Sequence, residues 1–213
     1  MIDGALQELS SIEARLCVTT TPAFAANWLA PRQAAFGRTF AGIRLSVETG
    51  HEPIDLDRHR DIGLAIRYSN RCPHADASLL ARERFAVFGT PSYIASLKSP
   101  ADALFAITDW QRPVHPAADL GTWLDIAGVE ADPANLRVSR FDQEHHAISL
   151  ALSGQALAFC SNLLVSHLVR DSLLEPYLPN ASIEGLAYWT IVNPASLRPR
   201  VAERFRDWIS EQV

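Results

Sequence analysis

The chain has 213 residues, of which 48% are hydrophobic and 20% are charged, and its formal net charge at pH 7 is −5. That length is enough for one large domain or for two small lobes with buried cores. A domain that grips nucleic acid by itself usually carries a basic face, and this acidic chain shows no basic stretch that would supply one. No apolar run reaches the length of a membrane span.

The three cysteines, Cys17, Cys72 and Cys160, are far apart and form no CxxC pair. Cys17 and Cys160 lie in apolar runs, so we expect buried free thiols, which suit a reducing cytoplasm. The first residues lack the charged start and apolar core of a signal peptide. Apolar residues at helical spacing between positions 2 and 12 instead predict the tail of an amphipathic helix that belongs to a longer, cytoplasmic protein.

The first regular element is a strand over residues 15–20, followed directly by Thr21 and Pro22. A threonine before a proline is the usual start of a helix, because the hydroxyl caps it and the proline ring fits its first position. We therefore predict a helix from residue 22 onward, kinked at Pro31 because proline breaks the backbone hydrogen-bond ladder.

The remaining pattern alternates between strands and helices. Strands are predicted over residues 43–48, 62–66, 85–88, 136–141, 156–160 and 186–192. Helices are predicted at 121–128, from a cap at Asp142 to Leu152, through 163–168, and at 201–209, with a short helix or turn within 53–59. This alternation predicts an α/β fold with largely parallel sheets. The elements form two successive sets, which indicates two lobes, and ligands of such folds bind at the carboxyl ends of strands.

Several short segments, in this order and spacing, resemble the effector-binding domain of LysR-type transcription regulators, especially the glycine-cleavage-activator branch. The segments are Thr20–Phe24, Trp28–Arg32 with Phe36, Asp55-Leu56 with Leu64–Tyr68, Ala151–Ala158, and Phe205–Ile209. The resemblance spans about residues 14–210. Gly63, Ser69 and Ala156 depart from the usual family pattern near the expected ligand site, which bears on ligand identity more than on fold.

The resemblance implies two Rossmann-like lobes joined by two crossover strands, as in periplasmic binding proteins of type II. The crossover strands would lie around Phe85–Thr90 and Tyr188–Asn193. Residues 1–13 would end a linker helix, residues 14–88 and 191–213 would form lobe I, and residues 89–190 would form lobe II.

The resemblance also implies partners. These are a small-molecule effector between the lobes and a second copy of the chain. The full-length protein would be a tetramer, and its contact with DNA would run only through an N-terminal winged helix-turn-helix outside these residues. The alternative is a transport-type solute-binding protein of the same fold.

Candidate ligand-binding residues stand at strand ends. Thr20 and Thr21 offer hydroxyls and unpaired N–H groups to an anion, with helix capping as the alternative role. Arg67 suits a carboxylate, so we expect a carboxylate or amino-acid-like effector, with a structural ion pair as the alternative. Tyr68 ends the same strand and is the fourth candidate.

Phe141 and Tyr188 are weaker candidates, because aromatic residues beside strand ends are more often part of the core. His145 and His146 are adjacent and have no histidine partner three or four residues away, so no metal site is predicted. Phosphate-binding, dinucleotide-binding and serine-hydrolase motifs are also missing from the sequence. We therefore predict no cofactor and no catalytic residue.

Overall fold

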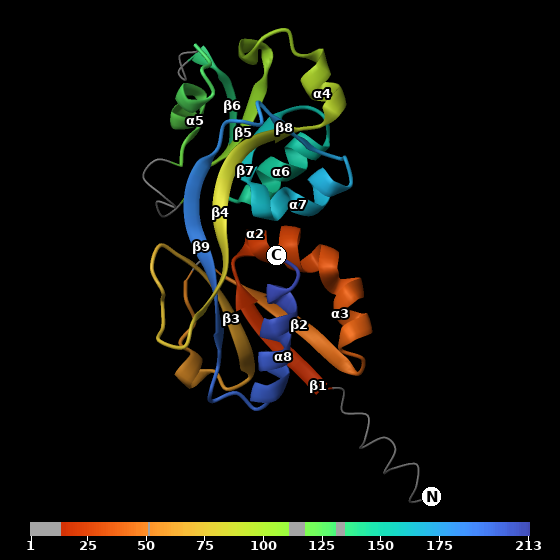
Figure 1. Ribbon diagram of the computed structural model, residues 1–213, viewed down its shortest axis with the longest axis vertical. Helices are drawn as coiled ribbons and strands as arrows, with labels where there is room; N and C mark the ends of the chain where they lie inside the picture. Colours follow the sequence, from red (N-terminus) through yellow and green to blue (C-terminus); the bar gives the residue numbers. More distant parts are fainter. Residues whose placement is uncertain (1–13, 51, 111–117, 131–134) are drawn as a thin grey trace, which may run out of the picture.

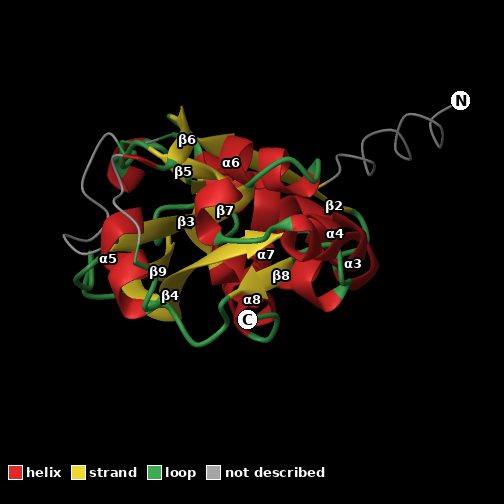
Figure 2. Cartoon of the chain, turned by 90° about the horizontal axis from the view of Figure 1, so that it is seen from above, coloured by secondary structure: helices red, strands yellow, loops and turns green. Residues whose placement is uncertain are grey.

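The computed structural model describes residues 14–50, 52–110, 118–130 and 135–213. These residues form two α/β lobes, one above the other in Figure 1, and two long strands run from one lobe into the other. Helices lie on both sides of these long strands when the molecule is viewed from above (Figure 2). No described helix has the length and apolar character that crossing a membrane requires.

Lobe I, the lower lobe in Figure 1, is built on three parallel strands. They are β2 (Ile43–Thr49), β1 (Ala14–Thr20) and β3 (Ile62–Ser69), with β1 in the middle. Its helical segments are α2 (Pro22–Phe24), the π-helical turn η1 (Ala25–Leu29), the 3-10 turn η2 (Ala30–Arg32), α3 (Gln33–Thr39), the 3-10 turn η3 (Leu56–Arg58) and the last helix α8 (Pro199–Ser210).

The start of the first helix follows from its sequence. The Thr21 hydroxyl accepts a hydrogen bond from the Phe24 N–H at 3.3 Å, and Pro22 occupies the first turn, so the predicted cap is confirmed. Pro31 lies in the 3-10 turn η2, where its missing N–H interrupts the α-helical ladder. In place of one regular helix, the segment changes from α to π to 3-10 geometry before α3 begins.

Lobe II carries three more parallel strands, in the order β7 (Leu157–Ser161), β5 (Leu104–Thr108) and β6 (Arg137–Phe141). Around them lie α4 (Pro91–Ser96), the 3-10 turn η4 (Pro100–Asp102), α5 (Leu120–Ile126), α6 (Glu144–Leu152), α7 (Asn162–Arg170) and the short strand β8 (Glu175–Tyr177).

Two long strands, β4 (Ser78–Gly89) and β9 (Ile183–Val192), connect the lobes. They are antiparallel to each other, and they are also antiparallel to β3 and β7, their neighbours in the sheet. The sheet is therefore mixed, which corrects the expectation of largely parallel pairing. One strand passes from lobe I to lobe II and the other returns, so the two must run in opposite directions.

The predicted two-lobed α/β fold with two crossover strands is confirmed. The crossover strands are longer than predicted, because β4 begins at Ser78 and β9 at Ile183. The predicted lobe boundaries fall inside these two strands and stay predictions. The linker helix predicted for residues 1–13 lies outside the described residues.

Most of the buried apolar side chains form two clusters. The larger one contains residues of both lobes, among them Val18 and Phe205 of lobe I and Ile148 and Leu164 of lobe II. The smaller one lies in lobe II and the adjoining crossover strands, around Trp123. The lobes are therefore packed against each other and do not hang on a flexible tether. Cys17 and Cys160 are buried free thiols, as predicted, and Cys72 is exposed.

Candidate functional site

The two lobes meet where the first helical segment of lobe I contacts two helices of lobe II. In Figure 1, α6 and α7 lie directly above α2, and the contacts between α2 and α6 and between η1 and α7 agree with this view. We call this region the lobe junction. Several of the predicted ligand-binding residues lie in or beside it.

Thr20 and Thr21 stand at the carboxyl end of β1, where the chain enters α2. The Thr20 side chain is buried, and its hydroxyl oxygen has no hydrogen-bond partner among the described residues. The Thr21 hydroxyl caps the helix and also interacts with the hydroxyl of Tyr188, whose pKa burial raises well above its usual range and this contact partly lowers. The two adjacent threonines therefore differ, because one hydroxyl is used inside the protein and the other is not.

An aromatic row runs from β3 through β9 to the first helical segment. The ring centroids of Tyr68 and Tyr188 are 4.8 Å apart, those of Tyr188 and Phe24 are 4.7 Å apart, and those of Phe24 and Trp28 are 5.0 Å apart. Tyr68 and Tyr188 are direct partners in the pairing of β3 with β9. The row holds Tyr68 against Tyr188, and the Tyr188 hydroxyl interacts with Thr21. Three of the six predicted site residues are therefore brought together.

Besides Thr20, which precedes Thr21 in the chain, the remaining two predicted residues, Arg67 and Phe141, are not placed against these three by any contact. Arg67 precedes Tyr68 on β3, so its side chain points to the opposite face of the sheet. It is half-buried, burial lowers its pKa, and its guanidinium donates to the backbone oxygen of Ile54 at 3.4 Å. Phe141 ends β6 and packs edge-on against His146, with ring centroids 6.2 Å apart.

Two glutamates that sequence reasoning did not single out lie buried at the lobe junction. Glu83 on β4 is 2% exposed and Glu144, the first residue of α6, is 3% exposed. The Ser161 N–H donates to Glu144 Oε1 at 2.6 Å, and the Ser161 and Tyr68 hydroxyls interact with the Glu83 carboxylate. Burial raises the pKa of both carboxyls, and the charge of Glu83 raises that of Glu144 further.

A second set of charges lies between η2 and α7. The Arg32 guanidinium stacks over the Trp28 ring at 4.0 Å and donates to the Trp28 backbone oxygen at 2.9 Å. Burial lowers the pKa of Arg32, and the nearby charge of Arg170 lowers it further. Burial and Arg32 also lower the pKa of His167. Positive groups from both lobes therefore face one another here.

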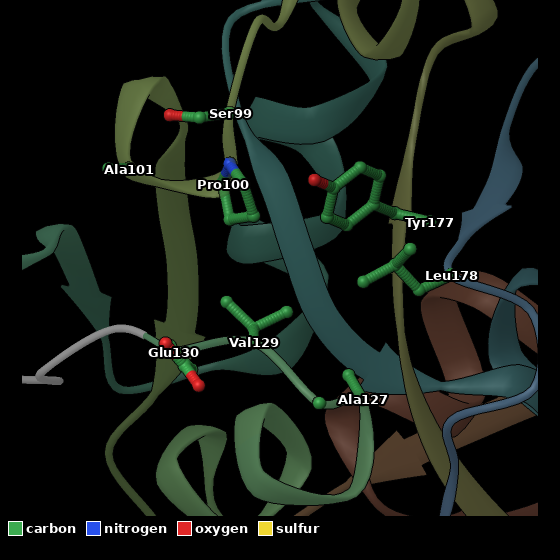
Figure 3. Close-up of a pocket in the computed structure, with 9 residues that line it drawn as sticks. Ser99, Pro100, Ala101, Ala127, Val129, Glu130, Tyr177 and Leu178 are labelled. Carbon is green, nitrogen blue, oxygen red and sulfur yellow. The ribbon is translucent and has the colours of Figure 1, made fainter.

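A separate pocket of about 530 Å³ lies in lobe II, away from the lobe junction. In Figure 3 Tyr177 and Leu178 form one side, Pro100 lies opposite, and Val129 projects between them. Among the described residues of its lining Glu130 is the one that is charged, and none of the six predicted site residues is among them. The pocket and the predicted ligand-binding residues are therefore different places.

Within the described parts of the chain, no three histidine, cysteine, aspartate or glutamate side chains gather in a way that would hold a metal ion. The polar groups at the lobe junction are hydroxyls and carboxyls, which suit hydrogen bonding to a small molecule.

Comparison with known proteins decides the family. The family described as the LysR substrate binding domain matches residues 10–213. The chain belongs to this family. It is the effector-binding regulatory domain of a LysR-type transcription regulator, as the sequence predicted.

The similar proteins of known role are transcription regulators. The AhcY transcriptional activator HvrB of Rhodobacter capsulatus is 26% identical over 222 residues, which cover 100% of this LysR domain and 72% of HvrB. The HTH-type transcriptional regulator PerR of Escherichia coli is 31% identical over 199 residues, which cover 91% of this chain and 65% of PerR. The transport-type alternative finds no support among these relatives.

Solved structures show the same fold. The effector domain of AmpR from Pseudomonas aeruginosa matches with a TM-score of 0.66 and 21% identity, over 93% of this chain and 95% of that one. The regulatory domain of CrgA from Neisseria meningitidis matches with a TM-score of 0.65 and 23% identity, over 94% of this chain and 98% of that one.

Sequence reasoning missed three junction residues of this LysR domain. Ser161 follows a buried strand and caps α7 by accepting from the Leu164 N–H, so the rule that found Thr21 would also have found it. Glu144 stands in the polar run 142–146, and Glu83 stands between Arg82 and Arg84. Polar and charged neighbours are typical of residues on the solvent-exposed surface, so no local signal marks either glutamate as buried.

Proposed function

We propose that a small-molecule effector binds at the lobe junction and shifts the position of one lobe relative to the other. A ligand can shift such an equilibrium only if it binds one arrangement better than the other. The observation that carries this proposal is the Thr20 hydroxyl, which is buried at the carboxyl end of β1 without a partner among the described residues. A buried hydroxyl without a hydrogen bond is costly, so an outside partner accounts for it.

The proposed contacts are the six predicted residues, Thr20, Thr21, Arg67, Tyr68, Phe141 and Tyr188. The proximity of Thr21, Tyr68 and Tyr188 supports three of them directly. We further propose a carboxylate or amino-acid-like effector. Arg67 forms no ion pair with another described residue, and the guanidinium of Arg32 adds positive charge beside the lobe junction.

The second part of the proposal concerns the full-length regulator to which these 213 residues belong. We propose a cytoplasmic protein that senses and does not catalyse, whose DNA contact is made by a helix-turn-helix outside this chain. The names of PerR and AmpR, which are called HTH-type regulators, support this. Pairing of effector domains as a homodimer, with tetramers at full length, is part of the same proposal. So is a place in the glycine-cleavage-activator branch, which rests on segments such as Leu64–Tyr68.

A thermal-shift screen of the purified chain against amino acids, small organic acids and cell-wall fragments tests the proposal. A ligand that binds only the native state raises the melting temperature. The variant Thr20→Val keeps the shape of the side chain but removes its hydroxyl. We expect it to be at least as stable as the wild type and to lose the response to any compound that stabilises the wild type.

The matched control is Thr39→Val on the exposed end of α3, which should keep the full response. An unchanged response in Thr20→Val would contradict the role of Thr20. A compound whose effect is the same in variants of all six residues would contradict the proposed site.

A further inference from the structure

The buried glutamates stand at the point where a crossover strand passes between the lobes. Glu83 interrupts the pairing of β4 with β9, which is formed before it up to Arg82 and after it at Arg84, and the pairing of β4 with β7 begins two residues later at Phe85. The β4–β9 register shifts between Arg82 and Arg84, so Glu83 occupies an irregularity of the strand. Such irregularities bend a strand and re-aim its side chains.

The partner strand is shaped to admit this side chain. Gly185 of β9 faces the irregularity, and a Cβ atom there would lie 3.2 Å from Glu83 Cβ, 3.1 Å from the Tyr68 hydroxyl and 2.8 Å from Phe85 Cε2. A residue other than glycine would push Glu83 and Tyr68 away. The close approach of Glu83 to Tyr68 therefore depends on the two strands together.

Glu83 is connected to both lobes. Its carboxylate interacts with the hydroxyl of Tyr68, which belongs to lobe I, and with the hydroxyl of Ser161, which belongs to lobe II. The N–H of the same Ser161 binds Glu144 Oε1, so one serine joins the two carboxyls. We call Glu83 and Glu144 the carboxyl pair, and the hydroxyls of Ser161 and Tyr68 surround it.

The charge around the carboxyl pair is unbalanced. No basic side chain of the described residues forms an ion pair with Glu83 or Glu144, and Glu83 Oε1 has no hydrogen-bond partner among them. The other titratable groups that face the pair are Tyr68 from β3, Tyr188 from β9 and Cys160 from β7, and burial raises the pKa of all three, which keeps them neutral. Two adjacent buried carboxylates without a cation are unstable, so the pair holds a proton in this arrangement of the lobes.

We propose that Glu83 and Glu144 form a proton-operated hinge, in which the protonated pair holds the lobes in the arrangement seen here and loss of the proton loosens the lobe junction. When the proton leaves to solvent, two negative charges face each other with Ser161 between them. Water then has to reach the pair, and separation of β4 from α6 and β7 admits it. This response needs no effector, so it stands independently of the proposed ligand site.

The direction of the pH effect follows from proton linkage. A glutamate in an unfolded chain titrates at about 4.3. Burial raises the pKa of Glu83 to about 7 and that of Glu144 well above its usual range. The folded chain therefore binds more protons than the unfolded chain from about pH 4.3 upward, and the contribution of the pair to stability falls as the pH rises through 7.

The test compares the melting temperature of the 213-residue chain between pH 5.5 and pH 8.5 in the wild type, Glu83→Gln, Glu144→Gln and the double variant. Glutamine resembles the protonated acid and cannot lose a proton. We expect the wild type to lose several degrees toward pH 8.5 and the double variant to lose much less. Glu203→Gln on the exposed face of α8 is the control and should follow the wild type.

Small-angle X-ray scattering on the same samples measures whether the lobes move relative to each other. The radius of gyration of the wild type should increase between pH 5.5 and pH 8.5, and that of the double variant should not. A wild type of constant size, or a double variant with the same pH profile as the wild type, overturns the proposal.

If the variants fail to fold, infrared spectroscopy of the wild type decides the question. The absorption of protonated carboxyl groups should persist at pH 6.5, where exposed carboxyls are ionised, and should weaken as the pH rises through 7 and Glu83 loses its proton. Its absence at pH 6.5 overturns the proposal.

Discussion

Thr20 and Thr21 show how two adjacent residues of one type can have separate roles. The backbone of Thr21 has the extended conformation of a helix cap, and its hydroxyl satisfies the Phe24 N–H that helix geometry leaves unpaired. The hydroxyl of Thr20 is buried one residue earlier without a partner among the described residues. The first role serves folding, and the second leaves a hydroxyl that the proposed effector could bind.

Thr21→Ala removes the cap and should lower the free energy of unfolding by about 1 kcal/mol, because the first turn of the helix loses the acceptor of one N–H group. Thr21→Ser keeps an oxygen in the same position and should recover most of that loss. Chemical denaturation of both variants at one pH measures the difference. Equal destabilisation by serine and alanine would show that the Thr21 methyl group, and not the cap, is what matters.

At the scale of an element, most of a crossover strand serves regular sheet pairing, while one position is adapted to the carboxyl pair. Most of β9 pairs regularly with β3, but its start has to accommodate the irregularity of β4 at Glu83. Gly185 is the adaptation, because its missing side chain leaves room for the Tyr68 hydroxyl and the Phe85 ring. The strand therefore gives up side-chain packing at one position so that the carboxyl pair can form.

Gly185→Ala should destabilise the chain by about 1–3 kcal/mol, the usual range for overpacking a tight site. The added methyl group would meet Phe85 at 2.8 Å, and the ring is part of a fully buried cluster that cannot move freely. Gly37→Ala on α3, where nothing lies within 4 Å of the added atom, is the matched control and should not destabilise the chain. Equal effects of the two substitutions on the free energy of unfolding would contradict the tight fit.

The strands and helices that sequence reasoning found are those with a local signal. The strand β1 and the helix after it carry an alternating pattern, a cap and a proline, and all three are where they were expected. The first half of β4 was missed because charged residues at 82–84 conceal it, and β5 was missed because five residues carry no distinct period. Antiparallel pairing of the crossover strands was missed as well, because it depends on the path of the chain between lobes.

The presence or absence of a local signal also decides which residues of the lobe junction could be predicted from the sequence. Thr21, Tyr68 and Tyr188 were predicted because they stand at or beside the ends of predicted strands, and they lie close together although 47 and 120 residues separate Thr21–Tyr68 and Tyr68–Tyr188 along the chain. Glu83 and Glu144 are buried only because β4, α6 and β7 converge. Burial that arises from convergence of distant elements has no local pattern, so the carboxyl pair could not be predicted from its neighbours in the sequence.

At the scale of the whole molecule, the two lobes share one sheet and one apolar cluster. The cluster includes Val18 and Phe205 in lobe I and Ile148 and Leu164 in lobe II. A movement of the lobes has to preserve much of this contact, because exposing it would cost about 25 cal/mol for each Å² of apolar surface. We therefore expect a small rearrangement around β4 and β9, and not a wide opening.

The shared cluster also predicts how the molecule unfolds. Phe205 on α8 is fully buried, and its ring lies 5.7 Å from that of Phe36 and 5.6 Å from that of Trp208. Phe205→Ala should lower the free energy of unfolding by about 3–5 kcal/mol. Because the cluster reaches into lobe II, calorimetry of the variant should show one transition at a lower temperature, with both lobes lost together.

A matched substitution, Glu203→Ala, changes an exposed residue of the same helix and should alter stability by no more than about 0.5 kcal/mol. Phe105→Ala, in the smaller cluster of lobe II, should also shift a single transition. If Phe205→Ala instead splits the unfolding into two transitions and leaves the higher one at the wild-type temperature, the lobes fold independently. The lobe junction would then be a contact between two stable bodies, and the coupling of its carboxyl pair to the whole fold would have to be weak.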